Sequence, residues 1–493
     1  GANPSDGNGT VLVVTGRTPE EVQEAARAVV FLPEGLSENA SQSVSAPEAL
    51  PRIPYDAPAF ISTSRVVRFG ELVSDAALTG HGYIPGTLSI PFRILPDLYT
   101  WRDKPFLAKV GINGPLGSIV DLDRSHVDVS LNGLYLRSYS WRVPTLLPLW
   151  VSRYFPSTSA SQQDRIKLPV WGVYAQNQLD FYFSGRPAAN TQIAASGQDV
   201  TVSIDPDSTL DFRRAYHFAV LPNLAMFANS AFPFTRLADL SETVICLPDH
   251  PDSAVTTAFL DMMGTIGSYT WYPADKMTLI GESALTSGKT FPDQDVLVMG
   301  TLGLGRSYAS LLAATPYALE NGKLHFRQRT MLDGVRYFFA DLAGNTISDT
   351  GTVKLQGALS LQSGGALIAA RSPYASHRSL VMMLAGTPQG LDELVHAMRD
   401  PERQRGIQGD LTVVNGTHVV ASRNGVSYTV GSLPFWVNIE RIFREHPFRI
   451  IVAAAIAILL IGRSLHKAVM YQAMLRKRVM DEVQFSRQGG QVQ

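Results

Sequence analysis

The chain has 493 residues, of which 42 are Lys or Arg and 43 are Asp or Glu, so its charge is almost balanced. This balance, without a basic domain or a Lys/Arg stripe, argues against nucleic acid as a partner. Hydrophobic residues make up 45% of the chain, which is enough for several packed cores. The single cysteine, Cys246, cannot form an internal disulfide and lies in an apolar run, which predicts a buried core residue.

A strand, turn and helix unit occurs near both ends of the chain. Residues 11–28 and 380–397 each combine an apolar run, a Thr-Pro pair and a helical pattern of apolar residues. Thr18 and Thr387 are suited to cap these helices, each followed by a proline in the first turn. The repeat predicts two α/β domains of one type, the first of them represented only by residues 1–33.

A linker and a β domain are predicted next. Residues 34–65 are rich in Ser, Pro and Ala, which is typical of a linker. Over residues 66–225, short β-like runs such as TLSIPFRI, HVDVSLNGLYLRSYSW and LDFYFSG alternate with turns rich in Gly, Pro, Asn and Asp. This spacing predicts an all-β sandwich or jelly roll.

Strands and helices alternate again over residues 226–431. Strands are predicted at 243–247, 276–281, 295–300 and 380–384, and a helix at 253–266. This order predicts an α/β domain with a parallel sheet. Residues 324–368 are predicted to form an insertion of mainly β character.

A helix with an aromatic edge is predicted over residues 432–446. Its apolar residues recur at helical spacing, with charged residues between them, which favours a position in a membrane interface. The alternative is an ordinary helix docked on the preceding domain. The predicted apolar residues are Phe435, Trp436, Ile439, Ile442 and Phe443.

A transmembrane helix is predicted over residues 447–470. Residues 450–462 read IIVAAAIAILLIG, and this uncharged run would cover roughly 20 Å as a helix. The arginines beside it can extend their charges toward the membrane surfaces and lengthen the span. The heavier cluster of Lys and Arg follows the span, so residues 471–493 are predicted to be a cytoplasmic tail. The anchor residues are Arg449, Ile450, Leu460 and Arg463.

Several enzyme signatures occur only in part. Gly288-Lys289-Thr290 lacks the earlier glycine and the following helix of a phosphate loop. The Asp pairs at 121 and 123 and at 205 and 207 lie in turn-rich segments, where Asp is common. The histidines show no metal-ligand spacing. No catalytic residue, metal or cofactor is therefore predicted.

Aromatic and polar residues of the β domain instead favour sugar binding. Asp97, Tyr99 and Trp101 would point to one face of an extended segment, where rings could stack on glucose and the carboxylate could bind hydroxyls. Asn132 and Tyr135 complete the candidate set. Core packing is the alternative for any single ring.

The segments FRILPDLYTW at 92–101 and VDVSLNGLYLR at 127–137 resemble the carbohydrate-binding-like domain of the bacterial cellulose synthase regulatory subunit. FPFTRLADL at 232–240 and the single C-terminal span are similar to the same family. The resemblance implies alternating carbohydrate-binding jelly rolls and flavodoxin-like domains. Residues 1–33 would then end a first flavodoxin-like domain, and 226–431 would form the second.

The resemblance also implies a function. The chain would be a non-catalytic, single-pass inner-membrane protein with its bulk in the periplasm. Its partners would be the catalytic synthase subunit, nascent cellulose and, through self-association, further copies of itself. The family carries an older label as a cyclic-di-GMP-binding protein, but Asp128, Ser130 and Gly133 match only half of a receptor motif for that nucleotide. An envelope polysaccharide hydrolase and a scaffold without sugar contact are the alternatives.

Overall fold

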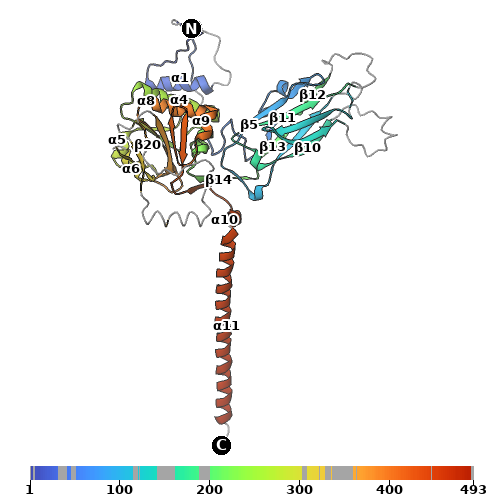
Figure 1. Cartoon of the computed structure of the whole chain (residues 1–493), viewed down its shortest axis with the longest axis vertical. Helices are drawn as coiled ribbons and strands as arrows, with labels where there is room; N and C mark the ends of the chain where they lie inside the picture. The colour runs from blue at the N-terminus through green and yellow to red at the C-terminus, as the bar shows by residue number, and fades with distance from the viewer. Residues whose placement is uncertain are drawn as a thin grey trace, which may run out of the picture.

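The structure, a computed structural model, contains a β domain, an α/β domain and one long C-terminal helix that projects away from both (Figure 1). It describes residues 2–3, 6–31, 41–45, 51–114, 120–121, 123–141, 161–187, 200–301, 308–320, 323–327, 335, 359–361, 364–445 and 447–489.

The β domain is built from two antiparallel sheets. One has the order β3-β13-β7-β12-β4, with β10 also paired to β7, and the other has the order β5-β11-β8-β9. The strands of the first sheet are β3 (Val67–Arg68), β4 (Thr79–His81), β7 (Phe106–Asn113), β10 (Ser161–Leu168), β12 (Thr201–Ile204) and β13 (Thr209–Asp211). Those of the second are β5 (Leu88–Arg93), β8 (His126–Leu131), β9 (Leu134–Ser140) and β11 (Gln176–Ser184).

Alternating side chains decide which face of each sheet is buried. In β11, Leu179, Phe181 and Phe183 are buried while Gln178 and Tyr182 are exposed, as the two-residue period of a strand requires. The buried residues of both sheets form one hydrophobic core. The predicted β domain is therefore confirmed.

A small third sheet joins the two domains. It has the order β25-β14-β6 and consists of β6 (Leu98–Thr100), β14 (Ala215–Leu221) and β25 (Tyr428–Gly431). Because β25 comes from the end of the α/β domain and β6 from within the β domain, its antiparallel pairings connect segments far apart in sequence.

The α/β domain has a mixed seven-stranded sheet of order β16-β15-β17-β22-β21-β23-β24. Pairings among the first four strands are parallel, and all pairings of β21 and β23 are antiparallel. The prediction of a parallel sheet is thus correct for part of the sheet only. The strands are β15 (Thr243–Leu247), β16 (Thr278–Gly281), β17 (Asp295–Thr301), β21 (Gly365–Arg371), β22 (Ser379–Ala385), β23 (Leu411–Asn415) and β24 (His418–Ser422).

One predicted boundary needs correction here. The predicted insertion at 324–368 overlaps β21, which lies inside the central sheet between β22 and β23. The residues of β21 are mostly apolar because both faces of this strand are buried. Of the predicted insertion, only 324–327, 335, 359–361 and 364–368 lie within the described residues, and β19 (Lys323–Phe326) pairs there with β18 (Tyr317–Glu320) and β20 (Leu359–Ser360).

Helices cover the sheet. Three of them, together with inward residues of the sheet, form one core cluster: α3 (Leu224–Ser230), α4 (Ser253–Thr270) and α8 (Pro388–Arg399). Ile407, directly after the short helix α9 (Pro401–Gly406), belongs to the same cluster. The short helices α5 (Glu282–Thr286) and α6 (Ala309–Ala313) contribute to a second cluster with β18 and β19. The predicted cap of α8 is confirmed, because Thr387 accepts a hydrogen bond from the Gly390 N–H and Pro388 begins the helix.

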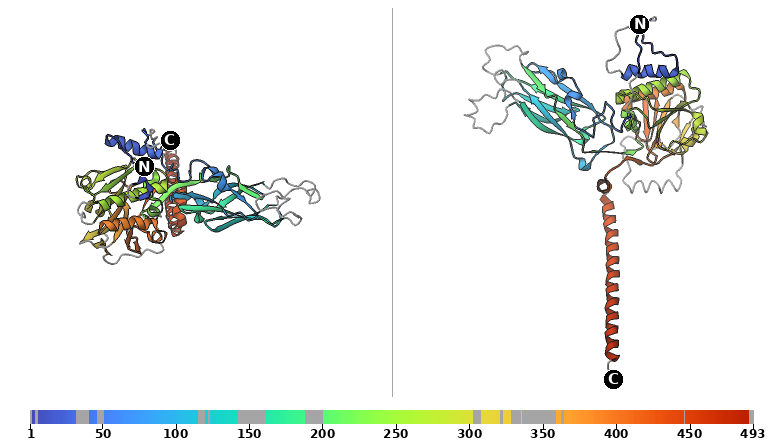
Figure 2. Two further views of the ribbon diagram at one scale, coloured as in Figure 1. Left: turned by 90° about the horizontal axis from the view of Figure 1, so that it is seen from above. Right: turned by 180° about the vertical axis from the view of Figure 1, so that it is seen from behind.

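Helix α1 (Pro19–Phe31) lies along the α/β domain on the side of α4 and α8 (Figures 1 and 2). Arg27 pairs with Asp275 at 2.7 Å, and the Phe31 and Tyr272 rings lie 5.4 Å apart. The apolar run predicted as a strand before it is not one: the described strands there are β1 (Ala2–Asn3) and β2 (Asp6–Thr10). Leu12 and Val13 are 61% and 73% exposed, and no described strand pairs with them.

The chain ends in helices α10 (Phe435–Glu445) and α11 (Pro447–Gly489). Helix α11 begins at the predicted proline but continues well beyond the predicted span, so most of segment 471–493 is helical. Its residues Ala454–Met480 are long and apolar enough to cross a membrane, and none of that stretch is buried in the protein. Leu460 and Arg463 are exposed there.

Candidate functional site

The predicted sugar-binding segment lies at the junction between the domains. Asp97 is 2% exposed, and its carboxylate accepts a hydrogen bond from His217 Nδ1 at 3.1 Å. The other ring nitrogen of His217 lies 2.8 Å from the Thr63 hydroxyl, and the Tyr55 ring stacks on the imidazole at 3.4 Å. The prediction that Asp97 faces a sugar therefore needs correction, because burial and this pairing occupy its carboxylate.

Tyr99 and Trp101 are half-buried at the same junction. The Tyr99 ring packs edge-on against Phe218 of β14, with centroids 6.0 Å apart. The expected extended backbone ends at Thr100, and Trp101–Asp103 form the short 3-10 helix η3. Asp97 lies in the turn before β6 and Trp101 in η3 after it, so the three predicted residues do not belong to one strand.

The η3 segment holds helix α10. The Trp101 indole N–H donates to Glu440 at 2.6 Å, and Arg102 donates to the same carboxylate at 2.6 Å. Asp103 pairs with Arg444 one turn further along α10, at 2.7 Å. The Trp101 N–H and the Arg102 guanidinium hold the pKa of Glu440 below its usual value, because both stabilise the charged carboxylate.

The predicted interfacial helix is thus docked on one side and open on the other. Val437 is 6% and Arg441 4% exposed, and the Arg441 guanidinium lies 4.8 Å from the centre of the Phe218 ring. Phe435 and Trp436 are 69% and 76% exposed. Of the other predicted apolar residues, Ile439, Ile442 and Phe443 are half-buried. The helix has features of both alternatives, since it packs on the protein and still presents two large rings outward.

Asn132 has a structural role in the turn between β8 and β9. Its side-chain N–H groups donate to Gly172 O at 2.8 Å and to Asn177 Oδ1 at 3.0 Å, and its oxygen accepts from the Gln178 N–H at 2.8 Å. Its positive φ of 52° suits a turn residue. These hydrogen bonds occupy both N–H groups of the side-chain amide and one acceptor position of its oxygen. The Asn132 amide therefore has no donor left for a ligand.

Tyr135 does lie on an open polar surface. It is 61% exposed on β9, and the register places it beside Ser130 of β8, which is in turn opposite Asp180 of β11. Two residues further along the strands, Tyr182 of β11 is 44% exposed and lies opposite Asp128 of β8. We call the outward surface of β5, β11, β8 and β9 the tyrosine face.

Polar side chains between these rings are already ordered. The Ser89 hydroxyl donates to Asp180 at 2.6 Å, and Gln178 donates to the same oxygen at 2.8 Å. Strand spacing and rise place the two tyrosines roughly 12 Å apart, a span that a short oligosaccharide can cover. Ring faces with fixed carboxylates and hydroxyls between them can bind a sugar by stacking and hydrogen bonds.

The sequence analysis missed most of this face. Tyr182 belongs to the alternating segment QNQLDFYFS, whose apolar members are all buried. The two-residue period alone assigns Tyr182, Gln178 and Asp180 to one outward face, so this signal was available. The match of Asp128 and Ser130 to a nucleotide motif falls on the same strand, where they are outward-facing neighbours.

The two Asp pairs that partly match an enzyme signature accept hydrogen bonds within their own turns. Asp121 accepts hydrogen bonds from the N–H groups of Asp123 and Arg124, as the turn interpretation predicts. Asp205 likewise accepts from the Asp207 N–H at 2.9 Å. Cys246 is buried, and burial raises the pKa of its thiol to about 12. Among the described residues, no group of three or more His, Cys, Asp and Glu side chains could hold a metal ion.

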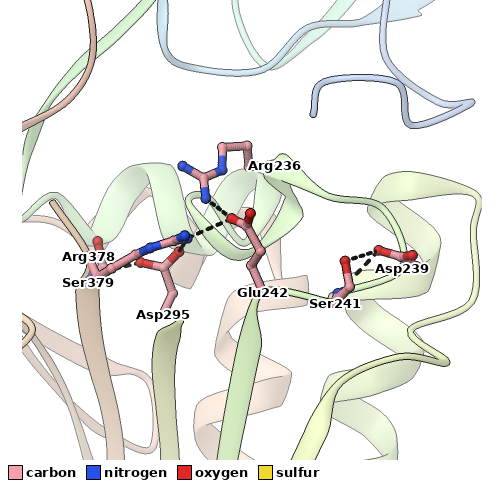
Figure 3. Close-up of polar contacts among 7 residues, drawn as sticks. All are labelled: Arg236, Asp239, Ser241, Glu242, Asp295, Arg378 and Ser379. Carbon is pink, nitrogen blue, oxygen red and sulfur yellow. Dashed lines mark hydrogen bonds and ion pairs between the residues drawn. The ribbon is translucent and has the colours of Figure 1, made fainter. Parts of the chain in front are cut away.

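A charged cluster lies where parallel strands of the α/β sheet begin (Figure 3). Glu242 accepts hydrogen bonds from Arg378 at 2.7 Å and from Arg236. Asp295 accepts from the Ser379 N–H at 2.6 Å and pairs with Arg378 at 3.3 Å. Burial alone would raise the pKa of Glu242, but the two arginines outweigh it and hold that pKa below its usual value. The cluster ties three strand ends together.

Comparison with known proteins gives matches over both domains. Residues 66–209 match the family model described as the second CBM domain of cellulose synthase BcsB, and residues 217–383 match its second FD domain. A "Cyclic di-GMP-binding protein" of Komagataeibacter xylinus is 39% identical over 98% of the chain, which covers 60% of that protein. "Cellulose synthase 2" of Novacetimonas hansenii is 38% identical over 94% of the chain, which covers 29% of it.

Two further Komagataeibacter xylinus proteins are 45% identical to the chain over 92% of its length. The chain spans 30% of each of them. The matched segments thus cover nearly all of the chain but only part of its curated relatives.

Proposed function

Because the chain belongs to the cellulose synthase BcsB family, we propose that it is a non-catalytic accessory part of a bacterial cellulose synthase complex. In this proposal α11 crosses the inner membrane once and packs against the catalytic subunit. The two domains lie on the periplasmic side, where the tyrosine face offers nascent β-1,4-glucan a surface along its route. The flavodoxin-like and jelly-roll assignments belong to the proposal, as does self-association with further copies of the chain.

One observation carries the proposal: the β domain is attached directly to the helix that leads into α11. Trp101 and Arg102 contact Glu440, and Asp103 contacts Arg444. These contacts restrict the movement of the tyrosine face relative to the membrane helix. An accessory subunit needs such a restriction if it is to keep a glucan surface in register with a membrane-embedded synthase.

Weak binding suits this task. A moving polymer must be released as each new glucose arrives, so a Kd near 1 mM, or about 4 kcal/mol, is expected for the tyrosine face. Weak affinity is expected because each exposed ring would contact the sugar on one face only and would not enclose it.

The test is a titration of the full chain, in detergent micelles, with cellohexaose. We expect Tyr182→Ala and Tyr135→Ala each to weaken binding several-fold while leaving the melting temperature unchanged. Trp271→Ala, which removes a 66% exposed ring from the α/β domain, is the control and should bind like the parent chain. Equal binding by all four proteins would remove the glucan surface from the proposal and leave a scaffold without sugar contact.

The synthase partnership needs its own test. Purification of the tagged chain from membranes should bring with it a glycosyltransferase that polymerises glucose. A preparation that retains α11 but contains no such enzyme would contradict the accessory role.

A further inference from the structure

A pocket of about 610 Å³ lies at the edge of the α/β domain, away from the tyrosine face. Three segments and two single residues line it. They are Pro222, Ala313–Pro316, Arg327, Ala369–Ser376 and Asn424–Tyr428.

The lining is positively charged. It contains Arg327 and Arg371, and none of the lining residues is Asp or Glu. Arg327 is held by the carbonyl oxygens of Ala313 and Tyr317 at 3.3 and 3.4 Å, which orient the guanidinium without neutralising it. Arg371 follows the last buried residue of β21, is exposed, and pairs with no acidic group of the described residues. The pocket therefore favours an anion.

Its wall is fixed by a buried hydrogen-bond network. Asp410 is 0% exposed and accepts from Tyr317 Oη at 2.8 Å, from the Asn424 N–H at 3.0 Å and from the Gly425 N–H. Tyr428 Oη donates to Ser379 Oγ at 2.7 Å, which links the wall to the charged cluster of Figure 3. A pocket held in this way keeps its shape when empty, so little ordering opposes ligand binding.

The pocket is close to the predicted membrane interface. Tyr428 precedes Phe435 of α10 by seven residues, which span at most about 25 Å even when fully extended. Figures 1 and 2 show β14, which ends next to Pro222, at the end of the α/β domain from which α10 and α11 leave. The exposed rings of Phe435 and Trp436 lie at the start of α10, where the segment from Tyr428 ends.

We propose that this pocket binds a phosphate ester, supplied by the headgroup of an anionic phospholipid. The planar guanidinium groups of Arg327 and Arg371 are suited to bidentate contact with phosphate oxygens. Hydroxyl groups of Ser372, Ser376 and Ser427 are further donors in the lining. The apolar walls, which include Pro316 and Pro373, can take the glycerol and first methylene groups of a lipid.

A lipid source is favoured over a soluble one by the short connection to α10. The headgroups of an anionic membrane are themselves phosphate esters, and they are present at high local concentration next to a basic pocket close to that surface. The inference rests on the membrane anchoring in the proposed function, but its test needs neither synthase nor glucan. Its failure would leave the accessory role untouched.

The experiment titrates the full chain in neutral detergent with short-chain phosphatidylglycerol, short-chain phosphatidylcholine and glycerol 3-phosphate, and follows the melting temperature. Phosphatidylglycerol should raise it in a saturable way, and phosphatidylcholine should have at least a tenfold weaker effect. Arg371→Gln and Arg327→Gln should each weaken the phosphatidylglycerol effect at least tenfold. Arg405→Gln removes an exposed arginine of α9 outside the pocket and should leave it unchanged.

Equal effects of the two lipids, or unchanged affinity in both pocket variants, would overturn the phosphate site. Binding of glycerol 3-phosphate as tight as that of phosphatidylglycerol would overturn the lipid source and assign the pocket to a soluble phosphate ester. If a pocket variant lowers the melting temperature before ligand is added, Arg371→Lys serves instead. It keeps the charge, loses the planar fork, and should bind with intermediate affinity.

Discussion

The indole nitrogen of Trp101 lies 2.6 Å from a carboxylate oxygen of Glu440, although 339 residues separate them in the chain. This hydrogen bond connects the β domain to α10, and α10 continues into the apolar helix α11 after a single intervening residue. A side chain predicted to stack on sugar therefore has a role in holding α10.

Trp101→Phe should loosen α10. The substitution keeps an aromatic ring but removes the N–H that Glu440 accepts, so backbone amides of 435–445 should exchange hydrogen faster, as measured by mass spectrometry. Trp436→Phe, at an exposed position of α10 itself, should leave the exchange unchanged. Unaltered exchange in Trp101→Phe would mean that the hydrogen bond does not hold the helix. The sugar-platform hypothesis makes a different prediction for Trp101→Ala, namely weaker cello-oligosaccharide binding with an intact fold.

Neighbouring residues of β11 should respond very differently to truncation. Phe181 is 0% exposed, and Phe181→Ala should lower the free energy of unfolding of the β domain by about 3–5 kcal/mol through lost burial and a cavity. Tyr182→Ala, on the opposite face, should change it by about 0.5 kcal/mol or less. Urea unfolding of both variants checks the register. Comparable losses would mean that the tyrosine face is not open.

Glu242 should contribute stability that depends on pH. Its folded-state pKa lies below the usual value of 4.5, so its contribution is fully present above that value and is lost as the pH falls through the folded pKa. Glu242→Gln should therefore destabilise the α/β domain at neutral pH, and the difference from the parent chain should shrink below pH 4.5. Thermal unfolding across this range measures the effect. A difference that does not change with pH would exclude a role for the Glu242 charge.

Deletion of all residues after Pro447 should release the two domains from membranes and abolish glucan synthesis by the complex. The reason is that the apolar stretch Ala454–Met480 is lost with α11. Fractionation shows the release, and incorporation of glucose into polymer shows the activity. Full synthesis with the truncated protein would contradict a coupling role for α11.

The orientation of the chain can be tested with introduced cysteines. Ser37→Cys should react with a membrane-impermeant thiol reagent in cells whose outer membrane is permeable, and Ser486→Cys should not. The native Cys246 is 0% exposed and should give no background labelling. Labelling at Ser486→Cys alone would reverse the proposed topology.

Local patterns in the sequence were enough to predict many elements. Alternating residues in the β domain, the Thr387-Pro388 start of α8 and the proline that begins α11 all depend on contacts within a few residues. The strand predicted at 243–247 is β15 over the same residues. Such elements follow from backbone geometry and from which side of each element is apolar, and both can be recognised from neighbouring residues.

Pairing between distant segments was decided only by the tertiary structure. The sequence contained no local sign that Asp97 would meet His217, or that β21 would join the central sheet rather than an insertion. The sequence of an apolar strand is similar whichever strand it pairs with. The sequence around a carboxylate likewise does not show whether its partner is a sugar, a histidine or an arginine. Its role depends on which charges and donors folding brings within about 4 Å, because at that distance an opposite charge or a donor stabilises the ionised form.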